Sequence, residues 1–175
     1  MKTYDIEKFL DEAYFKAEYE LMFQKTTNNR ELFLALWNIV KEKPKGKTWR
    51  LLWIMEHATE KDNTLIFEIL NDLHELVLKR DNDSYRRIGL KMILRCPLQE
   101  ELTGPLLDKC IEWINNPKVK VGTRALAFEY FSRTCQLYPE MAPELLAIID
   151  EQMERTPSAG LKSRMQQIRK QLARI

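Results

Sequence analysis

The sequence predicts an all-α protein built from helical hairpins, and three observations lead to this prediction. Apolar residues recur at helical spacing along nearly the whole chain, and no stretch shows the sustained alternation of a half-buried strand. All seven prolines lie at predicted helix junctions or in first turns, where a helix tolerates them. With 45% apolar residues and only five glycines, the composition is that of a globular chain. We expect one domain spanning residues 1–175.

Capping residues and helix breakers set the predicted boundaries. Asparagine and aspartate side chains accept hydrogen bonds from the N–H groups of a first turn, whereas proline and glycine end helices. The boundary residues are, in chain order, Asn28 and Asn29, Pro44 and Gly46, Asp62 and Asn63, Asp83 and Ser84, Pro97, Pro105, Asn116 and Pro117, Pro139, Pro143, and Ser158. The predicted helices cover residues 5–24, 30–43, 47–59, 62–80, 83–96, 101–115, 117–137, 139–155 and 158–174. The predicted buried side of the first consists of Ile6, Phe9, Leu10, Ala13, Ala17 and Leu21.

Short predicted loops require consecutive helices to lie antiparallel, as hairpins. The hairpins repeat: Arg50, Arg87 and Arg124 are 37 residues apart, and each precedes an apolar run. Arg164 follows 40 residues after Arg124. We therefore expect an N-terminal helix at about 4–24 and four stacked hairpins over about 28–174. In such a stack the repeated arginines would form a column, either bridging neighbouring repeats or contacting a ligand.

The repeat resembles HEAT and armadillo-like repeats in its period and in the pattern Arg124–Ala127–Phe131, which Arg86, Gly89 and Ile93 repeat one residue out of phase. The resemblance implies a right-handed α-α superhelix whose second helices line the concave side. Residues 49–57, 86–97 and 158–164 also resemble a family of short helical-repeat proteins from Bacteroidetes bacteria. In HEAT repeats a turn aspartate pairs with the arginine. The residues four before the arginines are Gly46, Asp83 and Lys120, so only the second hairpin could form that pair.

No motif in the sequence predicts an enzyme. Some members of the Bacteroidetes family are labelled adenylosuccinate lyase, but that class uses a much longer subunit with a Ser-rich, Met-containing loop, which this sequence lacks. The sequence contains no G-x-G-x-x-G, P-loop, H-E-x-x-H or nucleophile elbow. The carboxylate pairs at residues 11–12, 100–101 and 150–151 suit helix surfaces and first turns. Glu56 and His57 are adjacent, and a structural role for the histidine is the simpler interpretation.

We also expect no cofactor and no metal. The cysteines Cys96, Cys110 and Cys135 lie beside aliphatic residues and are predicted to be buried free thiols in a reducing cytoplasm. With only two histidines, the sequence has too few further ligands for a zinc site. The longest uncharged apolar stretch, Leu32–Val40, is far short of the ~20 residues of a membrane helix. The first seven residues mix charges, so we expect no signal peptide.

The predicted binding surface lies on the second helices of the hairpins. Its residues are Trp49, Arg50, Lys91, Arg95 and Arg133. Lys91 and Arg95 are one turn apart on a helix whose other faces are mostly apolar, so we expect both to point into solvent. A second basic group, on the last helix, consists of Lys162, Arg169, Lys170 and Arg174. It belongs to a region, residues 118–175, with 10 basic and 6 acidic residues.

These features favour a monomeric, non-enzymatic scaffold that binds a protein or peptide. The alternative is a nucleic-acid-binding or base-processing protein, because DNA glycosylases with HEAT-like repeats exist. That alternative would need a continuous basic groove and an exposed Trp or Tyr near a carboxylate. The net charge of +2 and the acidic residues interleaved through 45–117 count against it. A lyase-like enzyme would need a deep pocket that no sequence feature predicts.

Overall fold

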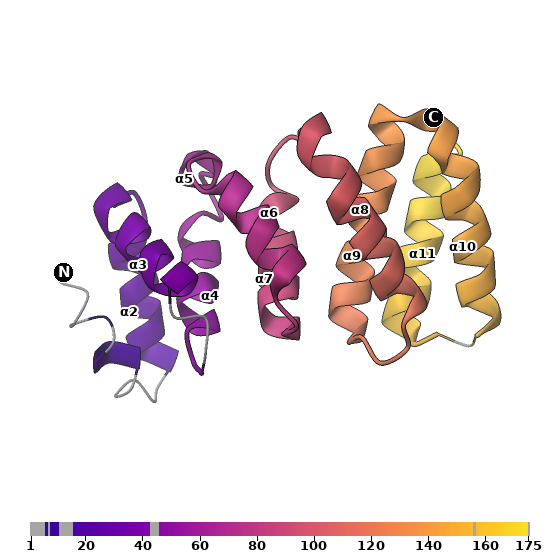
Figure 1. Ribbon diagram of the computed structural model, residues 1–175. Helices are drawn as coiled ribbons and strands as arrows, with labels where there is room; N and C mark the ends of the chain where they lie inside the picture. The colour runs from indigo at the N-terminus through magenta and orange to yellow at the C-terminus, as the bar shows by residue number, and fades with distance from the viewer. Residues whose placement is uncertain (1–5, 7, 11–15, 43–45, 156, 175) are drawn as a thin grey trace. The chain divides into compact units, whose positions relative to one another are not determined.

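A computed structural model describes residues 6, 8–10, 16–42, 46–155 and 157–174. Within these ranges every regular element is a helix, which confirms the all-α prediction. The chain divides into two compact units, Met1–Cys96 and Pro97–Ile175, which we describe separately (Figure 1). None of the described helices combines the length and the apolar character needed to span a membrane. The predicted single domain and the handedness of the superhelix stay predictions.

The N-terminal unit consists of helices stacked in hairpins. Its elements are α2 (Lys16–Thr26), α3 (Arg30–Glu42), α4 (Trp49–Ala58), α5 (Thr64–Phe67), α6 (Leu70–Lys79) and α7 (Asp83–Ile93). Helix α3 packs on α4 and α6 packs on α7, which are the first two predicted hairpins. Helix α4 also packs against both α2 and α7 (Figure 1). Helix α2 and the second helices α4 and α7 therefore form a layer with α4 at its centre.

The C-terminal unit has the same arrangement with longer helices. Its elements are α8 (Glu100–Asn115), α9 (Val121–Leu137), the short 3-10 helix η1 (Pro139–Met141), α10 (Ala142–Glu154) and α11 (Ala159–Leu172). Helix α8 packs on α9, α10 packs on α11, and α11 also packs on α9. The last two predicted hairpins are therefore present, and their second helices, α9 and α11, lie against each other.

Side-chain caps start several helices where the sequence predicts them. The Asn29 Oδ1 accepts from the Leu32 N–H at 3.0 Å, and the Asp62 Oδ1 accepts from the Thr64 N–H at 2.9 Å. The Ser158 Oγ accepts from the Leu161 N–H at 3.4 Å. For α7 the cap is Asn82, whose Oδ1 accepts from Ser84 and Tyr85 N–H groups, and not the predicted pair Asp83 and Ser84. The cap lies one residue earlier because Asn82 is extended, whereas Asp83 is already helical.

Two predicted helices differ in the structure. The helix predicted over 62–80 is broken at residues 68 and 69, and tertiary contacts flank the break. Glu68 pairs with Arg30 of α3, and the Asn63 side chain donates to the Arg95 carbonyl at 2.5 Å. The helix predicted from residue 117 begins at Val121, after a turn.

The predicted buried side of the first helix is only partly correct. Ile6 and Leu10 are buried, but Ala17 and Leu21 are exposed, and Ala13 lies outside the described residues. The residues of α2 that are buried are Tyr19, Met22 and Thr26. Apolar residues occur on several sides of α2, so packing against α4 decides which side is buried, and the helical pattern does not.

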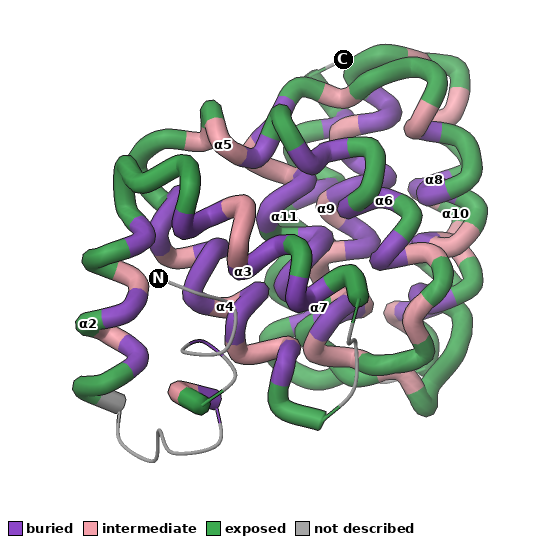
Figure 2. Tube along the Cα trace, turned by 60° about the vertical axis from the view of Figure 1, so that its left-hand side comes forward, coloured by how far each residue is buried: buried purple, intermediate pink, exposed green. Residues whose placement is uncertain are grey.

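Buried and exposed residues alternate along the helices of each unit (Figure 2). Fully buried examples are Phe33, Leu36, Leu51, Leu52, Ile54 and Met55 in the N-terminal unit, and Phe128, Tyr130 and Phe131 in the C-terminal unit. All three cysteines are buried free thiols, as the sequence predicts. Burial raises the pKa of the Cys135 thiol to about 11 and that of Cys110 well above its ordinary value, so both thiols are protonated and unreactive.

Candidate functional site

The junction between α4 and α7 contains a buried carboxylate. Glu56 on α4 is only 2% exposed, and its Oε1 lies 2.9 Å from the Lys91 Nζ of α7. The same oxygen accepts a hydrogen bond from the Arg95 guanidinium, which also donates to the Glu56 carbonyl at 2.5 Å. The Glu56 Oε2 lies 3.0 Å from the His57 Nδ1. We call Glu56, His57, Lys91 and Arg95 the α4–α7 charge cluster.

This cluster corrects the prediction that Arg95 points into solvent, whereas Lys91 is exposed as expected but also pairs with Glu56. Both side chains are turned toward Glu56, and only 20% of the Arg95 side chain is exposed, against 46% for Lys91. Arg95 lies two residues past the end of α7. The helical pattern of α7 places Lys91 on its polar side correctly. It carries no information on what α4 presents to that side, because the partners are 35 and 39 residues apart in sequence.

The repeat position of Glu56 predicts a buried charge, although the helical pattern of α7 does not. Glu56 is 37 residues before Ile93, which is 38 before Phe131, which is 37 before Ile168. The three later residues are at most 1% exposed and lie on the second helices α7, α9 and α11. A glutamate at a repeat position otherwise occupied by large apolar side chains predicts a buried charge, and a buried charge requires partners.

A row of aromatic rings runs along α2 and α4 in the N-terminal unit. The Tyr19 and Trp53 ring centroids are 6.0 Å apart, those of Trp53 and His57 are 4.5 Å apart, and those of His57 and Phe23 are 6.1 Å apart. These distances are typical of edge-to-face packing. Trp53, His57 and Phe23 are half-buried, so the row forms part of the surface. We call Tyr19, Phe23, Trp53 and His57 the aromatic row.

The predicted residues Trp49 and Arg50 lie at one end of this row. The Arg50 guanidinium carbon is 5.5 Å from the centroid of Tyr19 and 5.6 Å from that of Trp49. Its Nη1 donates to the Tyr19 hydroxyl at 2.7 Å. Trp49 and Arg50 are both half-buried. The structure therefore brings these two together with the aromatic row, and holds the arginine in one orientation.

The arginines at the 37-residue interval have three different environments. Arg50 bonds Tyr19, whereas Arg87 is exposed. Arg124 donates from Nε to the Ile114 carbonyl at 3.1 Å and from Nη2 to Gln152 at 2.6 Å. Burial, with a smaller effect of the nearby Arg155 charge, lowers the pKa of Arg124.

Arg86, and not Arg87, has the role that Arg124 has. The Arg86 Nε donates to the carbonyl of Arg80, at the end of α6, at 3.1 Å, as Arg124 does to the last turn of α8. Arg86 also pairs with Asp81 at 2.7 Å. The second hairpin therefore has an aspartate–arginine pair, but it joins Asp81 to Arg86 and not the expected residues 83 and 87. Arg86 has this role because its guanidinium contacts the end of the preceding helix, α6.

The C-terminal unit contains the remaining predicted residues. Arg133 is half-buried on α9. Lys162, Arg169 and Lys170 are exposed on α11 and Arg174 is exposed just after it, while the apolar residues Leu161, Met165, Ile168 and Leu172 are all buried. Arg169 pairs with Asp150 of α10. Arg164, also on α11, lies 3.0 Å from Glu129 of α9. The predicted amphipathic character of this helix is thus confirmed, and one of its four predicted cations is engaged in an ion pair.

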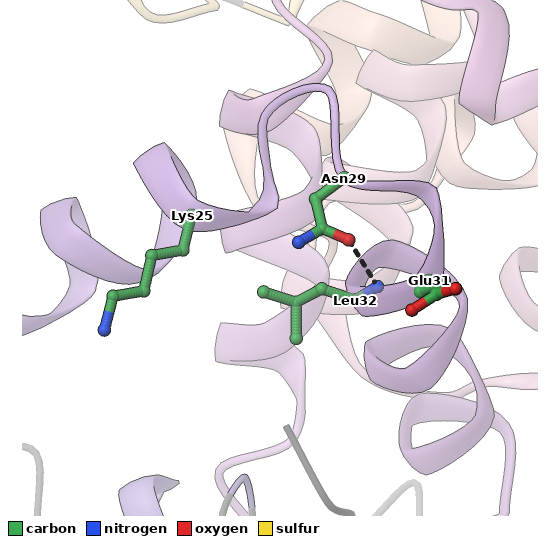
Figure 3. Close-up of a pocket in the computed structure, with 4 residues that line it drawn as sticks. All are labelled: Lys25, Asn29, Glu31 and Leu32. Atoms are coloured by element: carbon green, nitrogen blue, oxygen red, sulfur yellow. Dashed lines mark hydrogen bonds between the residues drawn. The ribbon is translucent and has the colours of Figure 1, made fainter.

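Surface hollows lie beside the turn that joins α2 to α3, and two of them are described here. The larger, about 440 Å³, is lined by Lys25, Asn29, Glu31 and Leu32, and the Asn29 amide oxygen there caps α3 (Figure 3). The second, about 300 Å³, is lined by Phe23, Gln24, Thr27, His57, Ala58, Glu60 and Lys61. It lies at the end of the aromatic row, and we call it the α2–α4 hollow. No group of three His, Cys, Asp or Glu residues suited to a metal ion occurs in the described part of the chain.

The comparisons with known proteins identify a family. A family model for the HEAT repeat domain matches residues 6–172, which is nearly the whole chain. No curated protein and no solved structure matches it. The match agrees with the repeated helical hairpins of both units. The chain belongs to the HEAT repeat family.

Proposed function

We propose that this protein is a non-enzymatic scaffold that binds a peptide segment of a partner protein on the second helices of its N-terminal unit. Repeat proteins made of stacked helical pairs generally use an extended face for binding. In the N-terminal unit the second helices are α4 and α7, with α2 packed beside them.

The observation that supports the proposal is the half-exposed aromatic row with Trp49 and Arg50 at its end. Trp, Tyr and Arg are the side chains that most often contribute the binding energy of an interface. Here they are already packed against one another, and the Arg50–Tyr19 hydrogen bond holds the guanidinium in place. A pre-ordered surface loses little side-chain entropy when a partner binds.

The other predicted residues have different roles in this proposal. Arg95 and Lys91 are positioning residues, because they hold Glu56 and thereby α4 against α7. Lys91 is still 46% exposed and is available for a partner contact as well. Arg133 would be a separate contact in the C-terminal unit. The proposal requires neither an enzyme activity nor a cofactor.

The test compares two variants in an assay of partner binding. The protein is used to capture its partner from native cells, and the affinity of the purified partner is then measured. The double variant Trp49→Ala, Arg50→Ala should weaken binding by about 30-fold or more, the effect of losing one strong contact of about 2 kcal/mol. The matched control is Arg155→Ala, an exposed arginine of the C-terminal unit. Equal affinities for the double variant and the control would overturn the proposal.

The basic helix α11 favours a second candidate function, the binding of nucleic acid. Within Ala159–Leu172 it has Lys162, Arg164, Arg169 and Lys170 and no acidic residue. Binding through phosphates would weaken steeply with salt. The test is a titration of mixed-sequence single- and double-stranded DNA with wild type and with the variant Lys162→Gln, Lys170→Gln, Arg174→Gln. The candidate requires weaker binding and a smaller salt slope in the variant; no binding at low salt would overturn it.

A further inference from the structure

We infer that the α2–α4 hollow is a socket for one neutral aromatic side chain with a hydrogen-bond donor, a tyrosine or tryptophan of the bound peptide, and that His57 is the acceptor. The inference rests on the proposed function, because it specifies which partner residue the surface selects.

The surroundings of His57 determine which nitrogen of its neutral ring carries the proton. The Nδ1 lies 3.0 Å from the Trp53 carbonyl oxygen and 3.0 Å from the Glu56 carboxylate. Both oxygens only accept hydrogen bonds, so the Nδ1 must donate. In the neutral imidazole the Nε2 is then the unprotonated nitrogen and a hydrogen-bond acceptor.

The ring is also fixed in orientation. Its centroid lies 4.5 Å from that of Trp53, at an interplanar angle of 60°, and 6.1 Å from that of Phe23. The carboxylate that accepts from the ring is itself held by Lys91 and Arg95. The α4–α7 charge cluster therefore orients a ring that lines the hollow on its α4 side.

The lining of the hollow suits a neutral aromatic ligand. Phe23 and Ala58 supply apolar surface, and Phe23 and His57 supply two ring faces or edges against which a third ring can pack. Glu60 and Lys61 contribute opposite charges, so the lining has no net charge to attract an ion. A tyrosine or tryptophan has an apolar ring and one polar donor, the combination that such a site requires.

A histidine–carbonyl contact does not by itself indicate a binding site, because His74 has the same contact. Its Nδ1 lies 2.9 Å from the Leu70 carbonyl oxygen, in the same i to i−4 relation that His57 has with Trp53. His74 is 5% exposed, lines no hollow described above, and forms no ion pair with a carboxylate in the described residues. His57 differs by its neighbour Glu56 and by its position in the wall of the hollow.

The test measures binding of two small probes, N-acetyl-tyrosinamide and N-acetyl-phenylalaninamide, to the full chain by NMR. These probes differ only in the hydroxyl donor. One hydrogen bond between neutral groups should make the tyrosine probe bind about three- to tenfold more tightly. The resonances of Thr27, His57 and Ala58 should shift, and those of His74 should not.

Two variants of His57 separate the acceptor from the ring. His57→Phe keeps an aromatic ring without an acceptor and should abolish the preference for tyrosine while both probes still bind. His57→Gln offers an amide oxygen and should retain the preference. Far-ultraviolet circular dichroism checks that each variant is folded.

The inference is overturned if neither probe shifts the hollow's resonances, if both bind wild type equally, or if the preference survives in His57→Phe. One variant distinguishes a failure of this inference from a failure of the proposed function. Trp49→Ala, Arg50→Ala should leave probe binding unchanged although it weakens binding of the whole partner.

Discussion

The two units join their second helices by different chemistry. In the C-terminal unit α9 packs on α11, and the fully buried residues of these two helices include Phe128, Phe131, Met165 and Ile168. At the α4–α7 junction of the N-terminal unit, the repeat position of Phe131 and Ile168 is occupied by Glu56, held by Lys91 and Arg95. The α9–α11 junction thus combines apolar contact with the half-exposed ion pair of Arg164 and Glu129, whereas the α4–α7 junction contains a buried carboxylate with its partners.

The two junctions should respond differently to the loss of a side chain. Apolar contacts are non-directional, so a lost side chain costs roughly in proportion to the surface and volume removed. A buried carboxylate needs every partner, because removing one leaves an uncompensated charge in a poorly solvated place. The charge cluster also gives α4 a neighbour with two matching cations, which makes the pairing of α4 with α7 specific.

The largest effect is expected at the α9–α11 junction, from a chain that ends at Pro157 and lacks α11. It would lose Leu161, Met165, Ile168 and Leu172, which are all buried. Burial of each is worth about 1.5–3 kcal/mol before the entropy of ordering the helix is subtracted. We expect a lower melting temperature and association of the exposed α9 surface, measured by calorimetry and light scattering. An unchanged melting temperature and a monomer would show that α11 does not stabilise the unit.

The next effect concerns the charge cluster. Arg95→Leu leaves Glu56 buried with fewer partners and should lower the free energy of unfolding by about 3–5 kcal/mol. Glu56→Ile, which restores the apolar residue found at position 93, should recover much of that loss when combined with Arg95→Leu. Urea unfolding of the two single variants and the double variant measures the coupling. Purely additive effects would mean that the two side chains do not act together.

A smaller effect tests the packing of α6 on α7. Gly89 occupies the repeat position of Ala127, but a Cβ atom at Gly89 would lie 2.3 Å from the Val77 Cγ2. Gly89→Ala should therefore destabilise the protein by about 1–3 kcal/mol through overpacking. Gly104→Ala is the control, since a Cβ there meets no atom within 4 Å, and it should be neutral or stabilising. Equal thermal stability of the two variants would contradict the crowding.

The smallest effect is a pH dependence confined to the N-terminal unit, which contains both histidines of the sequence. Burial lowers the pKa of His74 below its ordinary 6.5, so the folded protein favours the neutral ring. The unfolded chain binds a proton first, and stability is therefore lost as the pH falls below about 6.5. The melting temperature should fall less between pH 7.5 and pH 5.5 in His74→Gln than in wild type. An identical fall in both would exclude this histidine as the cause.

The sequence determined the features that depend on neighbours within one or two helical turns. Helix type, hairpin pairing, most boundaries, the buried cysteines and the buried face of α11 all follow from apolar spacing and caps. These patterns are local because an α-helix repeats every 3.6 residues. The buried face of a strongly amphipathic helix can therefore be predicted from its own sequence. Helix α2 lacks such a face, and there the prediction of its buried side was wrong for Ala17 and Leu21.

Only the tertiary structure decided which charged side chains meet. Glu56 and Arg95 are 39 residues apart, and Arg124 meets Gln152 across 28. The choice of Arg86 over Arg87 depends on a carbonyl at the end of another helix. A helical pattern shows on which face a charge lies, but its partner is set by the rotation and register of the helix packed against that face. Those are properties of the packed core, which is why the sequence placed Lys91 on the polar face of α7 but showed neither its pairing nor that of Arg95 with Glu56.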